Sequence, residues 1–173
     1  MALVFQYGSN CSESQINGKD RLCGDARFVG KAETVDDFRL DFNVWSKNRN
    51  CAASDIVISS GSKVWGVLYD VPDYLIGRDS ARDQHRRSLD AIEGEETNYK
   101  RESIAVRRED QQVVQALTYR VINPKAGLRT DLEYVGFIVA GLREHGVPEV
   151  YISQVKRIAE TNNPDIAGPL ANL

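Results

Sequence analysis

Residues 3–10 read Leu-Val-Phe-Gln-Tyr-Gly-Ser-Asn, an apolar and aromatic run that ends in three turn-forming residues. Val, Phe and Tyr favour β-strands, whereas Gly, Ser and Asn favour turns. The stretch therefore predicts a strand over residues 3–7 that leads into a turn at residues 8–10. Consecutive backbone N–H groups in such a turn can bind an anion together. An ordinary connecting turn is the alternative interpretation, because Gly-Ser-Asn is also common in turns that bind nothing.

Further along the chain, several segments have the composition of β-strands. Residues 38–44 alternate apolar and polar side chains, which is the pattern of a strand with one buried face. Residues 64–71, VWGVLYDV, are rich in β-branched and aromatic residues. Residues 104–106 and 113–122 are similar, and residues 109–111 are expected to turn between them. Strands are therefore expected to dominate the first two thirds of the chain.

The last third of the chain predicts two helices. Thr130 and Glu133 have the spacing of a capping box, and Gly146 provides a C-terminal stop for the first helix. The second helix is expected to start near Pro148 and to end at residues 162–164, Asn-Asn-Pro. Strands followed by helices indicate an α+β fold. The apolar residues that recur on one face of the first helix are Leu132, Val135, Ile138, Val139 and Leu142.

Composition and charge exclude several classes of function. The net charge of −3 and the pI near 5.5 argue against binding to nucleic acid or to an anionic membrane, since both need a clustered basic surface. No apolar stretch is long enough to span a membrane. The N-terminal residues lack the basic and long apolar regions of a signal peptide, so a cytoplasmic location is expected.

The cysteine and histidine content indicates reduced thiols and no metal site. Cys11, Cys23 and Cys51 form an odd and widely spaced set, as expected for free thiols in a cytoplasmic protein. With only His85 and His145 besides, no group of residues has the spacing of zinc ligands. Metal catalysis is therefore not expected.

Residues 89–94, Leu-Asp-Ala-Ile-Glu-Gly, contain a second candidate for chemistry. If residues 89–93 are helical, Glu93 lies at a helix C-terminus, where the helix dipole disfavours a negative charge. The pKa of Glu93 would then be raised, which suits a group that transfers protons. A solvated carboxylate beside a glycine cap is the alternative, and this segment by itself does not distinguish the two.

In their order along the chain, these segments resemble the γ-glutamylcyclotransferase-like superfamily, which includes the AIG2-like proteins. Residues 4–10 resemble its opening motif, aromatic-x-Tyr-Gly-Ser-Asn, and residues 64–69 resemble its central strand, Val-x-Gly-x-x-Tyr. Residues 89–94 followed by Tyr99 resemble Leu-Asp-x-x-Glu-Gly, a short gap and Tyr. Tyr119 stands where members carry a tyrosine on the next strand. The resemblance extends over nearly the whole chain.

The resemblance implies a mixed, barrel-like β-sheet with flanking helices, in a single domain over residues 1–173. It implies an enzyme that releases 5-oxoproline when the α-amine of a γ-glutamyl compound attacks that compound's γ-carbonyl. Glu93 would be the catalytic acid/base, without a metal or an organic cofactor. The predicted partner is a small γ-glutamyl molecule, and the chain would be a monomer or a homodimer. The residues that the resemblance assigns to substrate binding are Val4, Phe5, Gln6, Tyr7, Gly8, Ser9, Asn10, Tyr99 and Tyr119.

The sequence departs from the family pattern at three places. Cys11 stands where members usually have Leu, residues 50–55 replace a Gly-rich segment, and the charged stretch Asp73 to Ser88 looks like an insertion. A non-catalytic binding or regulatory module, with this stretch as its partner surface, is the alternative function. Retention of Glu93 and of the turn at residues 7–10 favours the enzyme. γ-Glutamyl dipeptides are the expected substrates, and glutathione, a γ-glutamyl-amine or a γ-glutamyl-protected metabolite are the other options.

Overall fold

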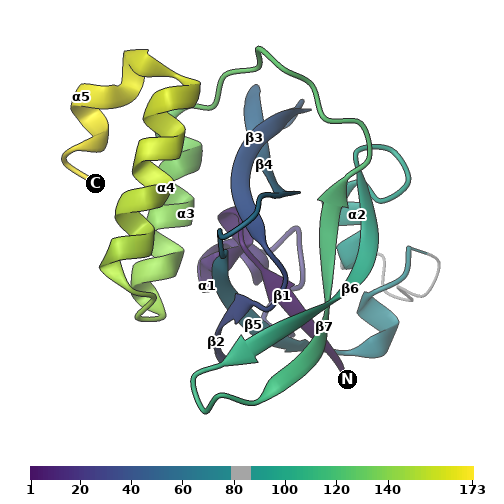
Figure 1. Cartoon of the computed structure of the whole chain (residues 1–173). Coiled ribbons are helices and arrows are strands. Elements are labelled where there is room, and N and C mark those ends of the chain that lie inside the picture. The colour runs from purple at the N-terminus through teal and green to yellow at the C-terminus, as the bar shows by residue number, and fades with distance from the viewer. Residues whose placement is uncertain (79–86) are drawn as a thin grey trace.

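Five strands close into a β-barrel in the computed structural model of the chain, which describes residues 1–78 and 87–173 (Figure 1). The strands are β1 (Ala2–Gln6), β2 (Arg27–Thr34), β5 (Trp65–Val71), β6 (Tyr99–Arg108) and β7 (Val113–Val121). Their order around the barrel is β1, β5, β2, β6, β7. β1 pairs antiparallel with β5 and parallel with β7, so the barrel is mixed. The predicted α+β fold with a mixed barrel is confirmed.

The second half of β1, one of the strands of the barrel, is buried. Val4 and Phe5 of β1 lie in the core, and Gln6 lies opposite Val67 in the register with β5. Gly66 allows these two strands to approach each other, because a Cβ atom there would lie less than 3.0 Å from the carbonyl oxygen of Gln6. The glycine of the predicted strand motif is therefore needed for close packing of backbone.

A two-stranded antiparallel sheet stands beside the barrel and consists of β3 (Phe38–Ser46) and β4 (Cys51–Ile58). Asp55 ties it to the barrel, because its carboxylate accepts a hydrogen bond from Val121 N at 3.0 Å. Asn43 Nδ2 donates to the same carboxylate at 3.0 Å. The strand expected over residues 38–44 is confirmed, whereas the sequence patterns do not predict β2 or β4.

Two long helices, α3 (Leu132–Glu144) and α4 (Glu149–Asn162), pack side by side next to the β3–β4 sheet (Figure 1). The short α5 (Ala167–Leu170) packs against α4 on the side away from this sheet. Both predicted helices are confirmed. The predicted capping box is wrong, because Asp131 caps α3 and accepts a hydrogen bond from Tyr134 N at 2.8 Å. Thr130 is the residue before the cap; its hydroxyl makes no hydrogen bond within the described residues, and the side chains of Asn162 and Asn163 bind its backbone N–H and C=O.

The remaining elements are short. They are η1 (Ser9–Cys11), α1 (Glu13–Ile16), η2 (Asp73–Leu75), α2 (Leu89–Glu93) and η3 (Pro164–Ile166). Leu75 and Ile76 are buried, so the start of the charged stretch contributes to the core. Most of that stretch, residues 79–86, lies outside the described part of the chain.

Two features are absent from the described residues. None of the described helices is long and apolar enough to cross a membrane. Within residues 1–78 and 87–173, no three His, Cys, Asp or Glu side chains are grouped closely enough to hold a metal ion.

Candidate functional site

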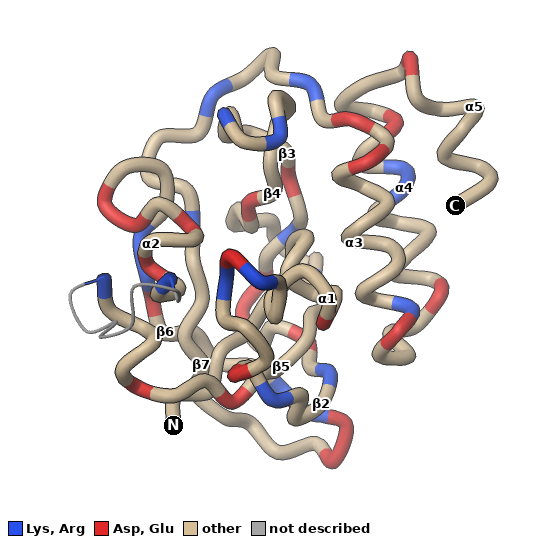
Figure 2. The backbone as a smooth tube through the Cα atoms, turned by 180° about the vertical axis from the view of Figure 1, so that it is seen from behind, with Lys and Arg blue, Asp and Glu red and all other residues tan. Residues whose placement is uncertain are grey.

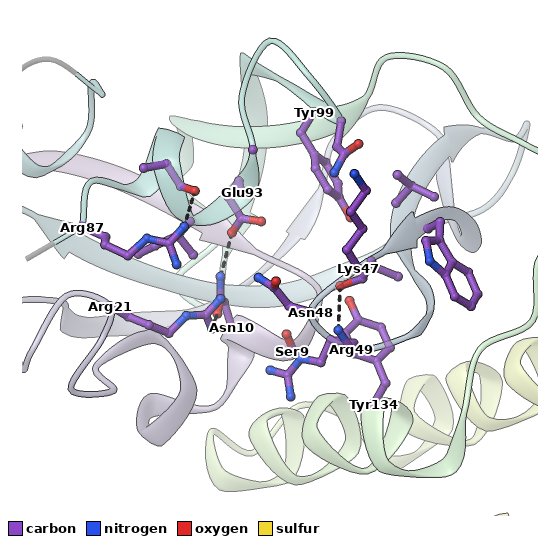
Figure 3. Close-up of a pocket in the computed structure, with 18 of the residues that line it drawn as sticks. Ser9, Asn10, Arg21, Lys47, Asn48, Arg49, Arg87, Glu93, Tyr99 and Tyr134 are labelled. Atoms are coloured by element: carbon purple, nitrogen blue, oxygen red, sulfur yellow. Dashed lines mark hydrogen bonds between the residues drawn. The ribbon is translucent and has the colours of Figure 1, made fainter.

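A cavity of about 510 Å³ lies between the turn after β1, the end of α2 and the loop that joins β3 to β4. A smaller recess adjoins it and shares five lining residues with it, among them Glu93. In Figure 3, Glu93 and Asn10 lie together on one side of the cavity, with Tyr134 of α3 on the other. The residues that line the recess are Gln6, Tyr7, Gly8, Ser9, Asn10, Ser54, Glu93, Tyr99, Tyr119 and Tyr134.

Glu93 is the last residue of α2, and Gly94 ends this helix in the left-handed conformation with φ of 68°. Its Oε1 accepts a hydrogen bond from Asn10 Nδ2 at 2.6 Å. Asn10 Oδ1 in turn accepts one from Arg21 Nη1 at 2.5 Å. These three side chains, joined in series in Figure 3, hold the Glu93 carboxylate at the cavity wall in one orientation.

The surroundings of Glu93 raise its pKa above the usual range, and burial is the main cause. The positive charge of Arg21, the hydrogen bond from Asn10 and the nearby amide of Gln6 oppose this rise. The direction agrees with the sequence prediction, but the cause differs. The sequence argument relied on a helix dipole, whereas α2 has five residues and desolvation dominates.

The turn after β1 presents unpaired backbone donors to the recess. The N–H groups of Gly8, Ser9 and Asn10 donate no hydrogen bond to any other group within the described residues. All three residues are buried and line the recess. Buried N–H groups normally have partners, so three consecutive ones without a protein partner indicate a place for an anionic or carbonyl oxygen.

Position 8 needs a glycine because Ser54 of β4 lies very close to it, and not because the backbone there has an unusual conformation. Its φ and ψ are −103° and −150°, which other residues also adopt. A Cβ atom at this position would lie less than 3.0 Å from Ser54 Oγ and 3.4 Å from the hydroxyl of Tyr134. The turn therefore packs closely against β4 where the recess narrows.

Four tyrosines wall the recess, and their hydroxyl groups already have protein partners. The Tyr7 hydroxyl donates to the carbonyl of Tyr119, and the Tyr99 hydroxyl donates to the carbonyl of Ser54 at 2.8 Å. Tyr134 and Ser54 share a hydrogen bond between their hydroxyls at 2.9 Å. Burial raises the pKa of each of these tyrosines, so they are neutral walls of the recess.

The hydroxyl of Tyr119 is directed to Asp90 and not to the recess. It donates to Asp90 Oδ1 at 2.7 Å, and Arg101 binds both oxygens of the same carboxylate at 2.8 and 3.0 Å. This buried group fixes the start of α2 against β6 and β7, because Asp90 belongs to α2. Tyr119 thereby helps to place Glu93, which follows Asp90 by three residues in α2.

The amide nitrogen of Gln6 is buried and makes no hydrogen bond of normal geometry within the described residues. It nevertheless lies close enough to Glu93 to lower the pKa of that carboxyl. An unpartnered buried donor costs free energy unless something binds it. Gln6 is therefore a donor available to a ligand in the recess.

The structure brings together most of the site residues that the sequence predicts. Gln6, Tyr7, Gly8, Ser9, Asn10, Tyr99, Tyr119 and Glu93 all line the recess. Val4 and Phe5 do not line it, because both lie in the barrel core. Ser54 and Tyr134 line the recess without having been predicted. They come from β4 and α3, and no local pattern distinguishes Tyr134 from the other buried positions of its helix.

Comparisons with known proteins identify a family model and solved structures that are similar to this chain. The model of the AIG2-like family matches residues 63–155. A solved structure described as a gamma-glutamyl cyclotransferase aligns with a TM-score of 0.77 and 24% identity, over 90% of this chain and 86% of that one. At this identity, the alignment shows a shared fold. A comparison with curated protein sequences found no match.

Two further solved structures share the fold. An uncharacterised human protein aligns with a TM-score of 0.74 and 25% identity, over 90% of this chain and 86% of its own. YkqA from Bacillus subtilis aligns with a TM-score of 0.69 and 19% identity over 93% of this chain, but over only 55% of its own length.

Proposed function

The chain belongs to the AIG2-like family, and we propose that it is a γ-glutamyl cyclotransferase. In this proposal it converts a γ-glutamyl compound into 5-oxoproline and releases an amine or an amino acid. The observation that carries the proposal is the placement of the Glu93 carboxylate beside three unpaired N–H groups of residues 8–10 in one recess. The similarity in fold to a gamma-glutamyl cyclotransferase supports it.

The unpaired donors suit the α-carboxylate of the glutamyl group. The N–H groups of residues 8–10 and the Gln6 amide offer hydrogen bonds to oxygen, and Arg21 adds positive charge nearby. A substrate held in this way has its α-amine close to Glu93. Because the amine and the γ-carbonyl belong to one molecule, this placement also brings the two reacting atoms together.

Glu93 would carry protons from the attacking nitrogen to the leaving nitrogen. The α-ammonium loses a proton to the carboxylate, and its nitrogen lone pair then attacks the γ-carbonyl carbon. The tetrahedral intermediate collapses when Glu93 gives this proton to the leaving nitrogen and the bond from carbon to that nitrogen breaks. The attacking nitrogen then loses its second proton, through the same carboxylate, to the released amine, so that a neutral 5-oxoproline ring and an ammonium group result. A carboxyl whose pKa is raised by burial is suited to both steps, since it binds a proton more readily than an exposed carboxylate and can still release it.

The alternative, a non-catalytic module, rests on the charged stretch Asp73 to Ser88. Most of that stretch lies outside the described residues, so this alternative stays a prediction. The cavity beside Glu93 supports the enzyme, because a binding module has no need of a carboxylate poised for proton transfer.

A 5-oxoproline release assay over a panel of γ-glutamyl compounds tests the proposal. Wild type should release 5-oxoproline and one equivalent of the amine, as identified by mass spectrometry. Glu93→Gln should lose this activity, and Glu160→Gln is its matched control, because it makes the same change at an exposed position of α4. Release of free glutamate, or no turnover of any γ-glutamyl compound, would refute the proposal.

A further inference from the structure

Positive charge is concentrated along the wall of the cavity of about 510 Å³ that adjoins the recess, here called the wide cavity. Four cationic side chains line it, against two carboxylates, although the whole chain carries a net charge of −3. Figure 3 shows two of the cations on the Asn10 side and two on the Tyr134 side. Elsewhere both signs of charge are interspersed, for example along α3 and α4 (Figure 2). The cations are Arg21, Lys47, Arg49 and Arg87, and the carboxylates are Asp20 and Glu93.

Carboxylates of the described residues do not neutralise the cations of the β3–β4 loop. Many other cations of the chain form ion pairs, such as Arg101 with Asp90 at 2.8 Å. In contrast, Lys47 and Arg49 form no ion pair within residues 1–78 and 87–173. Placing like charges around one cavity opposes folding unless an anionic ligand compensates for it.

Arg49 is also held in a fixed position. Its Nη2 donates to Gln15 Oε1 at 2.6 Å, and its guanidinium lies 4.6 Å from the centre of the Phe137 ring. Its charge, together with that of Arg87, contributes to lowering the pKa of Arg21, for which burial is the main cause. The guanidinium groups of Arg49 and Arg87 therefore interact unfavourably with that of Arg21.

A second cavity of about 260 Å³ continues the first along the β3–β4 loop. The two share Val44, Trp45, Lys47 and Asn98, and the second adds Lys125, another cation without an ion pair among the described residues. The space beyond Glu93 is therefore larger than the recess and lined by separated positive charges.

We infer that the leaving group of the substrate carries at least two negative charges, and that Lys47 and Arg49 recognise it. This inference rests on the proposed function, which places the glutamyl group in the recess and so directs the leaving group to the wide cavity. A neutral or cationic amine would leave these cations unpaired. A single carboxylate can neutralise only one of two cations that project from different positions of the loop. Two carboxylates, or a phosphate group, supply these two negative charges.

Matched substrate pairs test the inference. γ-Glutamylglutamate and γ-glutamylglutamine have nearly the same shape and differ by one negative charge. Wild type should convert the first with a kcat/KM on the order of tenfold higher, and the preference should fall as ionic strength rises. γ-Glutamyl-phosphoserine against γ-glutamylserine distinguishes phosphate from carboxylate as the source of the second charge.

Lys47→Gln and Arg49→Gln should each reduce the preference to a few-fold, because the substrate with two leaving-group carboxylates loses more kcat/KM than γ-glutamylglutamine does. Arg157→Gln, which removes an exposed cation of α4, is the control and should keep the full preference. Calorimetric binding of both dipeptides to Glu93→Gln measures the same preference without turnover. Equal kcat/KM or equal Kd for the two dipeptides in wild type and in Glu93→Gln would overturn the inference and leave the proposed function standing. Failure to release 5-oxoproline from any compound would instead refute the proposed function, and the binding ratio would still decide on the charge preference.

Discussion

A Gly8→Ala substitution gives the most direct test of how the turn after β1 serves the site. The added Cβ would lie less than 3.0 Å from Ser54 Oγ, while Ser54 Cβ at 3.6 Å and the Tyr134 hydroxyl at 3.4 Å are within ordinary reach. One atom therefore accounts for the conflict. The least costly relief is rotation of the Ser54 side chain, which breaks its 2.9 Å hydrogen bond to Tyr134.

The size of the effect follows from this geometry. Loss of one such hydrogen bond costs about 0.5–1.5 kcal/mol, and residual crowding in a packed site adds about 1 kcal/mol. We therefore expect Gly8→Ala to lower the free energy of unfolding by about 1–3 kcal/mol. The effect on activity should be larger, because displacement of catalytic backbone by about 1 Å can reduce the rate on the order of 10²-fold.

A double-mutant cycle isolates the cause. Ser54→Ala removes the conflicting oxygen, so Gly8→Ala combined with Ser54→Ala should recover most of the activity that Gly8→Ala alone loses. Urea unfolding and kcat/KM for 5-oxoproline release are the two measurements. If the two substitutions have simply additive effects on both quantities, contact with Ser54 is not the reason for a glycine at position 8, and the reasoning fails.

Three further predictions concern the chemistry. Glu93→Gln should lower kcat by about 10²-fold or more; it should also raise the free energy of unfolding at pH 8 but not at pH 4. Burial raises the pKa of Glu93, so the ionised carboxylate of the wild type opposes folding above that pKa, and this destabilisation is absent in acid. Urea unfolding at both pH values measures it, and an equal change in unfolding free energy at pH 4 and pH 8 would contradict the prediction. Asn10→Ala removes a hydrogen bond that lowers the pKa of Glu93, so the acid limb of the plot of kcat/KM against pH should move to higher pH. If the limb does not move, Glu93 is not the base whose titration sets it. An N-acetylated γ-glutamyl substrate should bind at best as an inhibitor, because its nitrogen is no longer nucleophilic; any turnover seen by mass spectrometry would indicate hydrolysis.

The parts of the fold that the sequence predicts are those with a local signal. β1, β3 and β5 have apolar or alternating runs, and α3 and α4 have helical periodicity. β4 has none of these, because it is Cys-Ala-Ala-Ser-Asp-Ile-Val-Ile and is buried on both faces over most of its length. Its Asp55 is unfavourable in a strand unless residues distant in the sequence supply partners, as Val121 N and Asn43 do here.

The residues of the candidate site also fall into two groups, those with a local signal in the sequence and those without one. Glu93 and the turn at residues 8–10 can be found from sequence, because each belongs to a short motif with a chemical meaning. Ser54, Tyr134 and Arg49 cannot, since β4, α3 and the β3–β4 loop reach the recess only through tertiary packing. The raised pKa of Glu93 was predicted with the wrong cause for the same reason, because burial is a property of the assembled recess.

Two glycines show how the fold positions the reactive groups. Gly8 allows the turn after β1 to approach β4, and Gly141 allows α3 to approach the end of the same turn, since a Cβ at position 141 would lie less than 3.0 Å from backbone atoms of Cys11 and Ser12. The turn is therefore held from two sides by elements distant in the sequence. Because Asn10 belongs to this turn and binds Glu93, the orientation of the carboxylate depends on the packing of α3 as well as on α2. Rigid support of this kind is what a single acid/base needs to meet both nitrogen atoms of one substrate.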